Sequence, residues 1–544
     1  MMVTRGYFRL PTFIAIGWVL MTSVACAPIE KRIERAAGGP KVPADSSVLM
    51  RAADAGRPEA VEAPVSTPGP LNLTVTEAIL LCLENNRALL VQRLNPSIRQ
   101  TVEDEERAVF DPAINADISA GKVKGERLAR SGSETEAFLI DTAEGTISLS
   151  QYFPTGTTVA LEAGTQMSDS SLYNDTFYPT RLGMTVTQAL LKGFGADVNL
   201  VRLQQAVIDT RMSEYELRGF TEALVAEMER TYWDYALARR QIEIVEQSLK
   251  VARQQLDETE TLITVGRLAK SELAAVRAEV AAQEQALIEV RANKETIRLH
   301  LLRLLNPAGP GLWQREVELT HPPVLPEITL EDVSLHVAVS MRMQPLLNEA
   351  RLEIVRGDLA LVETRDGLLP AMDFFITLGK SGYANSFKDS IGNIDEDSYD
   401  ALAGVRFNFP FFNREAKSLH QRALLTREQA QQSLENLAQL VELDVRTAYI
   451  EVNRTRQQIA ASSVTRMFDE EKLRIETEKL RVGKSTSFMV AQAQRDLLVS
   501  RIAEVRALTN YLKTLIDLYR QDGSLLERRG ISAPGREPVT FSIP

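Results

Sequence analysis

The residue types best suited to chemistry lie far apart in this chain. It has four histidines among 544 residues, and none has a second His or a Cys at the spacing of a metal site. The four are His300, His321, His336 and His420. Their separation predicts no metal site.

The motifs of nucleotide and acyl chemistry are also missing from the sequence. It contains no Gly-x-x-x-x-Gly-Lys-Ser/Thr phosphate loop, no Gly-x-Gly-x-x-Gly fingerprint and no Gly-x-Ser-x-Gly elbow. The acidic residues are interleaved with Lys and Arg at helical spacings. Such pairs are typical of a solvated helix face, where each contributes about 0.3–0.5 kcal/mol. We therefore expect no enzyme activity and no cofactor.

Composition narrows the class of protein further. The chain is 44% hydrophobic, which is enough for one large core or two to three ordinary ones. A net charge of −11 and a pI near 5.3, without clustered Lys and Arg, argue against a surface that follows phosphates. DNA and RNA are therefore not expected as partners.

The N-terminus has the layout of an export signal, which we place at residues 1–25. Arg5 and Arg9 precede an apolar run that is shorter than a membrane-spanning helix usually needs. Cleavage after Ala25 would suit an ordinary signal peptidase. Alternatively, the residues before Cys26 resemble a lipobox, although Ser replaces the usual Leu three positions earlier. Lipidation of Cys26 is the preferred interpretation, and the ordinary cleavage stays open.

Residues 26–71 are rich in Pro and Ala and read as an extended linker. The only other cysteine is Cys82, which lies in a helical pattern, so no internal disulfide framework is expected. Beyond the signal, no segment reaches 18 uninterrupted apolar residues. Any crossing of a membrane would therefore have to use β-strands.

The chain is an internal duplication with a long period. Two charge-rich helical stretches break at the same dipeptide, Val265-Gly266 and Val482-Gly483, which are 217 positions apart (482 − 265). That period is far too long for a solenoid repeat. It indicates two similar halves side by side.

Each half predicts the same series of elements. A helix opens near Leu73 and near Ile328, a proline follows at Pro112 and Pro370, and the pattern then becomes alternating. Candidate strands cover residues 113–121, 145–153, 157–168 and 181–190 in the first half, and 371–379 and 402–410 in the second. A turn at Pro154-Thr155-Gly156 joins two of them. The connection between the last two strands, residues 380–401, is polar and contains glycine, as an exposed loop would be. Alternation of this kind fits lipid-facing strands and the strands of a half-buried soluble sheet equally well.

Long helices follow the strands. From Tyr235 to Ile263 the apolar residues keep an unbroken 3-4 spacing. The helical pattern has no proline over residues 201–263 and would span on the order of 90 Å. After the Val-Gly break, the pattern returns and continues to residue 304. The second half repeats the plan at about 416–480 and 490–519. The spacing predicts coiled-coil packing.

These motifs together resemble the outer-membrane efflux protein family, the TolC-type exit ducts of Gram-negative bacteria. The resemblance covers about residues 72–525. It rests on the paired openings LTVTEAILLCLENN and ITLEDVSLHVAVSM, the strand endings VTQALLKGFG and FNFPFFNREA, and the paired turns VGRLAKSELAAVRA and VGKSTSFMVAQAQ. No single motif is decisive, but the motifs occur in the same order in both halves of the chain.

The resemblance implies a mixed α and β membrane protein that is internally duplicated. A long coiled-coil α-helical barrel and a transmembrane β-barrel would be shared by a homotrimer. The expected repeats are residues 72–310 and 327–525, followed by a C-terminal tail at 526–544. The implied setting is the bacterial outer membrane and its lipid, with a periplasmic extension. Implied partners are a periplasmic membrane-fusion adaptor and an inner-membrane pump, proton-driven or of the ABC type.

The resemblance also assigns roles to residues at and near the two turns. The candidate positions for docking the adaptor are Val265, Gly266, Arg267, Leu268, Val482, Gly483, Lys484 and Ser485. Many relatives narrow the tunnel entrance with an acidic ring beyond the second turn, where this chain has Met489 and Gln492. Glu272 holds the related position in the first half and could supply a carboxylate. The simpler reading of Glu272 is a solvated surface residue.

The predicted function is a passive duct in a tripartite efflux or type I secretion system. A drug, a metal ion, a polysaccharide or a secreted protein would each fit as its cargo. The extra strand-like hairpin near Pro154 departs from the family pattern, and could either enlarge the barrel or extend it beyond the membrane. The alternative function is a periplasmic coiled-coil adaptor or scaffold that does not span the membrane.

Overall fold

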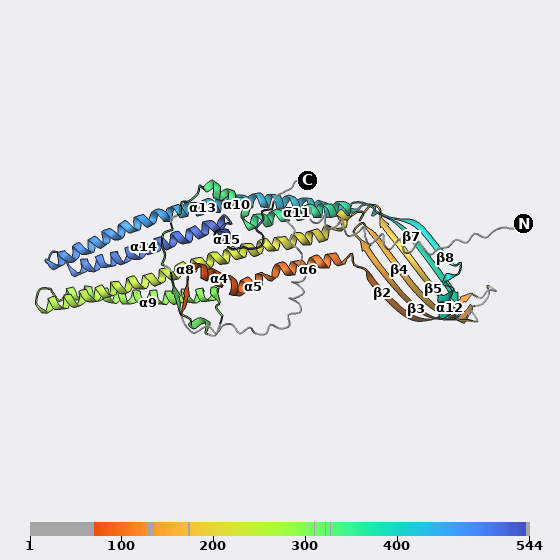
Figure 1. Ribbon diagram of the computed structural model, residues 1–544, viewed down its shortest axis with the longest axis horizontal. Coiled ribbons are helices and arrows are strands. Elements are labelled where there is room, and N and C mark those ends of the chain that lie inside the picture. Colours follow the sequence, from red (N-terminus) through yellow and green to blue (C-terminus); the bar gives the residue numbers. More distant parts are fainter. Residues whose placement is uncertain are drawn as a thin grey trace. The chain divides into compact units, whose positions relative to one another are not determined.

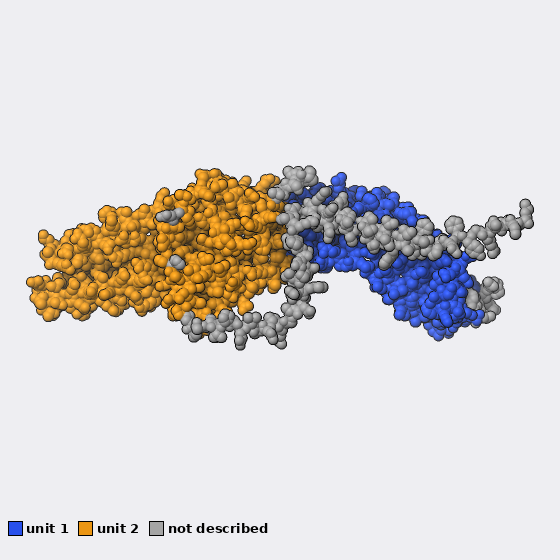
Figure 2. Space-filling model, in the orientation of Figure 1, with its two compact units in different colours: residues 1–54, 99–210, 354–430 blue, residues 55–98, 211–353, 431–544 orange. Residues whose placement is uncertain are grey.

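The computed structural model describes residues 70–128, 132, 135–171, 175–308, 311–320, 322–326 and 328–539. The expected signal peptide, Cys26 and nearly all of the expected linker lie outside these residues. Two compact units are coloured in Figure 2. Of the described residues, those within 99–210 and 354–430 form unit 1, and those within 55–98, 211–353 and 431–544 form unit 2.

The first half of the chain has helices, four long strands and a helical hairpin (Figure 1). Its elements are β1 (Leu71–Leu73), α4 (Val75–Asn85), α5 (Arg87–Gln92), α6 (Leu94–Ala108), β2 (Ala113–Leu128), β3 (Thr135–Phe153), β4 (Thr157–Ser170), β5 (Tyr178–Ala189), α7 (Ala196–Asn199), α8 (Val201–Thr264) and α9 (Glu272–Leu305).

The second half repeats this plan with two long strands. Its elements are η1 (Leu312–Gln314), β6 (Val317–Leu319), α10 (Val333–Met343), α11 (Pro345–Asp366), β7 (Ala371–Ala384), α12 (Phe387–Gly392), η2 (Asn393–Asp395), β8 (Tyr399–Asn408), α13 (Arg414–Arg481), α14 (Ser487–Gln521) and α15 (Leu525–Arg528). The expected mixed α and β fold, with long helices and a β-sheet, is confirmed. No helix among the described residues is both long enough and apolar enough to cross a membrane.

Local signals set the starts of the helices. Thr74 caps α4 in a capping box: its hydroxyl accepts from the Glu77 amide at 3.2 Å, and the Glu77 carboxylate accepts from the Thr74 amide at 2.8 Å. Asp332 caps α10 in the second half, where its carboxylate accepts from the amide of Ser334 at 2.9 Å. The opening helices of both halves therefore begin where polar side chains satisfy free amide groups.

Unit 1 is built on one antiparallel sheet with the strand order β2-β3-β4-β5-β7-β8. Its four first-half strands and two second-half strands lie side by side (Figure 1). The expected turn between β3 and β4 is confirmed: Gly156 has φ +82° and donates from its amide to the carbonyl of Phe153 at 2.9 Å. A left-handed residue at this point suits glycine, which has no Cβ to clash.

Two expectations for this sheet need correction. The strands are longer than the alternation suggested, since β2 continues to Leu128 and β3 begins at Thr135. The connection between β7 and β8, expected as a polar loop, contains α12 and the short helix η2. Ser386 caps α12, and the hydroxyl of Ser390 lies 2.7 Å from that of Thr180 on β5. The polar residues of this connection thus fold back on the sheet.

Unit 2 has its core around α8, α9 and α14. Strands β1 and β6 pair in parallel, and two tyrosines of α8 bind their carbonyls. Tyr232 donates to Leu73 at 3.1 Å and Tyr235 donates to Val317 at 2.9 Å. Buried apolar residues from both halves complete this core, among them Ala78, Cys82, Leu89, Met228, Leu301, Leu305, Val445, Ile516 and Leu518. The duplicated halves therefore share one core in unit 2.

Candidate functional site

The turn after α8 ends the helix with a glycine. Gly266 has φ +76° and its amide donates to the Ile263 carbonyl at 3.0 Å, while the Arg267 amide donates to the Leu262 carbonyl at 2.8 Å. This pair of bonds is a Schellman motif, which requires a left-handed residue after the last helical turn. The side chain of Val265 is 63% exposed. The turn therefore presents an apolar group to its surroundings.

The turn after α13 has the same geometry. Gly483 has φ +74°, its amide donates to Leu480 at 3.0 Å, and the Lys484 amide donates to Lys479 at 2.8 Å. Val482 is 68% exposed, as its counterpart is in the first half. Ser485 donates to the Glu476 carboxylate at 2.7 Å and so differs from Leu268. Figure 1 shows both turns at one end of the helices of unit 2.

Glu272 does not lie on a solvated helix face. Its carboxylate accepts from the amide of Ser487, the first residue of α14, at 2.8 Å. The carboxylate thus satisfies one of the free amide groups at a helix N-terminus, where a negative charge is favourable. The simple interpretation of Glu272 as a solvated residue was wrong because its partner comes from the other half of the chain. Met489 and Gln492 are exposed on α14.

A buried carboxylate behind Glu272 makes a further link between α9 and α14. Glu279 is 1% exposed and accepts from Arg495 at 2.7 Å and from Gln283 at 2.7 Å. The sequence interpretation missed these residues. One signal was present: the positions three and four residues from Glu279 on α9 hold Ala275, Val276, Ala282 and Gln283, so no cation of its own helix can pair with it.

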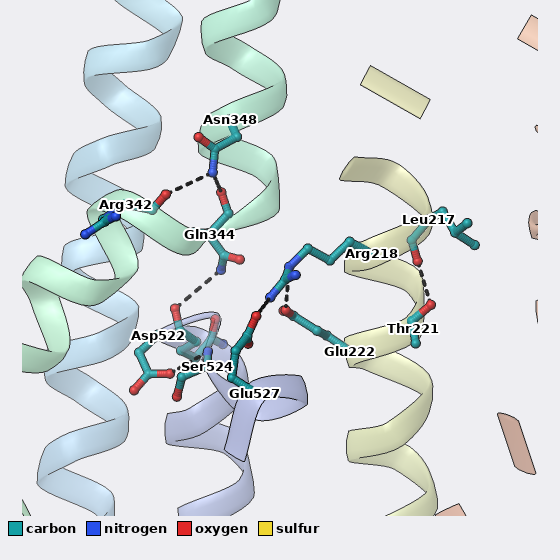
Figure 3. A network of polar contacts seen from close by, with 11 residues as sticks. Leu217, Arg218, Thr221, Glu222, Arg342, Gln344, Asn348, Asp522, Ser524 and Glu527 are labelled. Atoms are coloured by element: carbon teal, nitrogen blue, oxygen red, sulfur yellow. Dashed lines mark hydrogen bonds and ion pairs between the residues drawn. The ribbon is translucent and has the colours of Figure 1, made fainter. Parts of the chain in front are cut away.

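Deeper in unit 2, a second polar network joins the two halves (Figure 3). Arg218 on α8 is 1% exposed and donates to Glu527 on α15 at 2.6 Å. Glu222, one turn further along α8, lies 3.2 Å from the same guanidinium. Asp522 accepts from the amide of Ser524 at 2.9 Å. These contacts fix α15 against the first half.

Two of the histidines have structural partners, whereas His300 is exposed on α9. His336 lies 2.8 Å from Asp522 and both are buried, while His420 lies 3.1 Å from the hydroxyl of Thr364. His321 lies outside the described residues. Within the described part of the chain, no three residues of His, Cys, Asp or Glu form a group that could hold a metal ion.

Burial raises the pKa of Glu222 to about 8, because desolvation outweighs the opposite effect of Arg218. The ordinary value is 4.5. Between these two pH values the folded chain keeps a proton that the unfolded chain has released. The contribution of this group to stability is therefore complete below pH 4.5 and is lost as the pH rises to about 8.

The substitution Glu222→Gln is expected to remove this pH dependence. As the pH rises from about 5.5 to about 8.5, the parent protein should lose on the order of 2–3 kcal/mol of unfolding free energy relative to the variant. Thermal unfolding of both proteins at several pH values measures the difference. Glu243→Gln, at a half-exposed site paired with Arg240, is the control and should show no such trend. A constant difference at all pH values would contradict the assignment.

The two turns and the links behind them suit binding and packing. The turns carry exposed Val265 and Val482 beside the cations Arg267 and Lys484. Such a surface fits a protein partner with apolar and acidic groups. The α9–α14 links hold the first-half hairpin to the second-half hairpin immediately beside the turns.

Comparison with known proteins gives a family and a fold. The sequence model of the family described as "Outer membrane efflux protein" matches residues 78–307 and 342–524. No curated protein matches the sequence. Among solved structures, the chain resembles the CmeC outer membrane channel of Campylobacter jejuni at 14% identity and TM-score 0.63, covering 83% of this chain and 86% of that one.

Two further solved structures are similar. The outer-membrane channel OprN has 16% identity and TM-score 0.63, with 83% of this chain and 90% of that chain covered. The outer membrane protein VceC of Vibrio cholerae has 14% identity and TM-score 0.61, with 82% and 96% covered. At these identities the likeness establishes a shared fold.

Proposed function

The chain belongs to the outer membrane efflux protein family, and we propose that it is the trimeric exit duct of a tripartite efflux or type I secretion system. It is a protein of the bacterial outer membrane with a periplasmic extension. In this proposal the duct conducts its substrate passively and performs no catalysis. An inner-membrane pump, proton-driven or of the ABC type, supplies the free energy, and a periplasmic adaptor connects pump and duct.

The sheet of unit 1 supports an assembly of several copies. In our proposal each repeat, residues 72–310 and 327–525, contributes strands to a shared barrel and a helical hairpin to a shared tunnel. Within the described chain, the edge strands β2 and β8 each pair with a neighbour on one side only. Open sheet edges are not tolerated in hydrocarbon, because their amide and carbonyl groups would lack partners. Association of protomers satisfies these groups.

The proposed coupling of the duct to the adaptor rests on the matched pair of turns. Two Schellman turns, one from each half, lie at one end of unit 2 with exposed valines and cations. Their glycines leave open space, since a Cβ at Gly266 or Gly483 would meet no atom within 4 Å. We assign this end to the docking of the adaptor.

Photo-cross-linking tests the docking. A photoreactive residue in place of Val265 or Val482, in cells that contain the complete system, should give an adduct with the adaptor. Ile288 on α9 is 70% exposed and distant in sequence from both turns, so it is the matched control site. Mass spectrometry of the adduct identifies the adaptor, and the pump attached to it discloses the class of cargo. Adducts with the adaptor from Ile288 alone would refute the assignment.

Reversal of the turn charges should weaken the contact. The double substitution Arg267→Glu and Lys484→Glu is expected to lower the affinity for the adaptor by about tenfold, mainly through slower association. Binding of the purified duct to the immobilised adaptor measures the change. The double substitution Arg291→Glu and Arg303→Glu, at two exposed sites on α9, is the charge-matched control and should bind normally. Equal weakening by the control would indicate a general charge effect.

The rival function, a periplasmic scaffold, makes a different prediction for the whole protein. A duct must be recovered from the outer-membrane fraction as a heat- and SDS-resistant trimer. A scaffold would be recovered as a monomer that stays soluble without detergent. The sheet of unit 1 favours the duct, because its two edges need partners in an assembly.

We further propose that the entrance of the duct is controlled by packing. Glu272 and Glu279 of α9 hold α14, so separation of these two helices would widen the end of the protomer that carries the turns. Opening is then an equilibrium between two packed arrangements. Met489 and Gln492, on the exposed side of α14, are the proposed lining of the entrance, which lacks an acidic ring at these positions.

A further inference from the structure

One row of paired residues crosses all six strands of unit 1 and is apolar throughout. Following the strand register from β2 to β8, the row contains Ile114, Leu149, Leu161, Met184, Leu378 and Ala401. Five of these are large apolar side chains, and they are 37–72% exposed in the single chain. Because successive residues of a strand point to opposite faces, the whole row lies on one face of the sheet.

The neighbouring row, on the opposite face, is polar or small. It contains Asn115, Ser148, Glu162, Gly183, Gly379 and Asp400. Asp400 accepts from Arg181 of the same face at 2.7 Å. A sheet with one apolar and one polar face matches lipid outside and water inside.

The β2–β3 hairpin has the same apolar side as the other strands. On β2, the apolar side continues from Ile114 through Ala116 and Ile118 to Ala120, with Ile118 92% exposed. Opposite them in the register stand Leu149, Ile147, Gly145 and Ala143 of β3. A hairpin that extended beyond the membrane into water would not need this apolar side. Its register instead continues the apolar band of β5 and β7.

We infer that all six strands of each copy lie in the membrane, and that β2 of one copy pairs with β8 of a second copy. The direction of the strands permits this closure. Six successive antiparallel strands leave β2 and β8 running in opposite directions, so β8 next to β2 of the following copy is again antiparallel. The hydrocarbon of the lipid covers the apolar face, and the partner copy covers each edge.

The inference rests on the proposed trimer for its strand number. Three copies with six strands each form one barrel of 18 strands. Because barrel diameter grows roughly linearly with strand number, the barrel is about 1.5 times as wide as four strands per copy would give. With strands about 4.8 Å apart and tilted by about 40°, its backbone diameter is roughly 36 Å. The β2–β3 hairpin thus enlarges the duct at the membrane.

Cysteine labelling of the full-length protein in liposomes tests the position of β2. The Ile118→Cys variant, labelled with bimane, should be quenched by nitroxide-bearing lipid several times more strongly than the labelled Asp117→Cys variant. A charged, membrane-impermeant thiosulfonate should modify Asp117→Cys at least tenfold faster. Ile376→Cys and Thr377→Cys on β7 are the matched control pair. The parent protein, whose Cys82 is buried, gives the background.

The outcomes separate this inference from the proposed function. If lipid quenching and aqueous reactivity alternate between neighbouring residues on both β2 and β7, six strands lie in the membrane. Alternation on β7 with equal aqueous reactivity at both β2 sites overturns the inference and leaves the duct intact. Loss of alternation on both strands overturns the duct itself.

A second measurement tests the edge. A photoreactive residue in place of Ser119 should give dimers and trimers on a denaturing gel, with the adduct mapped to residues 399–408 of another copy. Adducts confined to one chain, adducts with any other strand of a second copy, or the absence of intermolecular adducts would refute the pairing of β2 with β8.

Discussion

Replacement of Arg529 by alanine is expected to lower the free energy of unfolding by about 3 kcal/mol. Arg529 follows α15 and donates two hydrogen bonds, both at 2.6 Å, to the carboxylate of Glu229 on α8. Glu229 is fully buried and Arg529 is 35% exposed. Without the guanidinium, a carboxylate stays buried without its counter-ion. The partial exposure of Arg529 places the loss at the lower end of the range for such pairs.

Unfolding in detergent, followed by the fluorescence of Trp233 beside the core of unit 2, measures this loss. Arg528→Ala is the matched control, because Arg528 is the adjacent residue and lies over the ring of Tyr519 at 4.2 Å. Its loss should stay near or below 1 kcal/mol. Adding Glu229→Gln to Arg529→Ala should restore at least half of the stability. Equal losses for the two arginine variants would contradict the buried-charge explanation.

The long helices could be predicted from the sequence because their signal is local. A helical pattern without proline predicted a helix over 201–263, and α8 spans Val201–Thr264. The sequence signal for the two turns was equally local. A glycine that follows a helix and precedes another helical pattern predicts a left-handed residue, and Gly266 and Gly483 both have positive φ. Their role in docking stays a prediction, since it depends on a partner.

The strands were predicted too short for a physical reason. Alternation of apolar and polar residues marks only the part of a strand that has an apolar face. Beyond Gly121, the side of β2 that began apolar carries Lys122, Lys124 and Glu126. Pairing with β3 holds this part of the strand, as in the contact of Lys122 with Asp141 at 3.1 Å. Such pairing is invisible in the sequence of one strand. Both strands were predicted, but neither their full length nor the hairpin that joins them was.

The polar links of unit 2 could not be predicted from local patterns. Arg218 and Glu527 are 309 positions apart, and Glu279 and Arg495 are 216 apart. Apart from the lack of a cation near Glu279 on α9, these residues look like members of solvated faces on their own helices. Only the packing of the two halves against each other buries them. The resemblance to the family located the turns, whereas the contacts that hold α9 to α14 depend on this chain's own side chains.

Loss of the Glu279–Arg495 pair is expected to open the entrance of the duct. A hydrogen bond between charged groups contributes about 1.5–3 kcal/mol, so Arg495→Ala should shift the equilibrium between closed and open entrances by roughly 10–100-fold. Arg495 is 43% exposed, which places the expected shift toward the smaller value. The conductance of the purified protein in planar bilayers should rise accordingly, because more time is spent in the open arrangement.

Arg474→Ala is the control for this experiment. Arg474 is a surface residue of α13 that pairs with Glu471 of its own helix at 2.6 Å, so its loss removes an ion pair that does not join α9 to α14. Its conductance should equal that of the parent protein. Glu279→Gln should act in the same direction as Arg495→Ala, and the double variant should exceed neither single variant by much, since both remove the same contact.

The oligomeric state distinguishes an effect of the substitution on the entrance from a general loss of stability. If Arg495→Ala raises the conductance while the trimer stays resistant to heat and SDS, the substitution acts on the entrance and not on assembly. If the trimer stays resistant and the conductance is unchanged, the pair stabilises the protomer without controlling passage. In that case the proposed gate, in which Glu272 and Glu279 hold α14 closed, is wrong even though the duct and its docking turns stand.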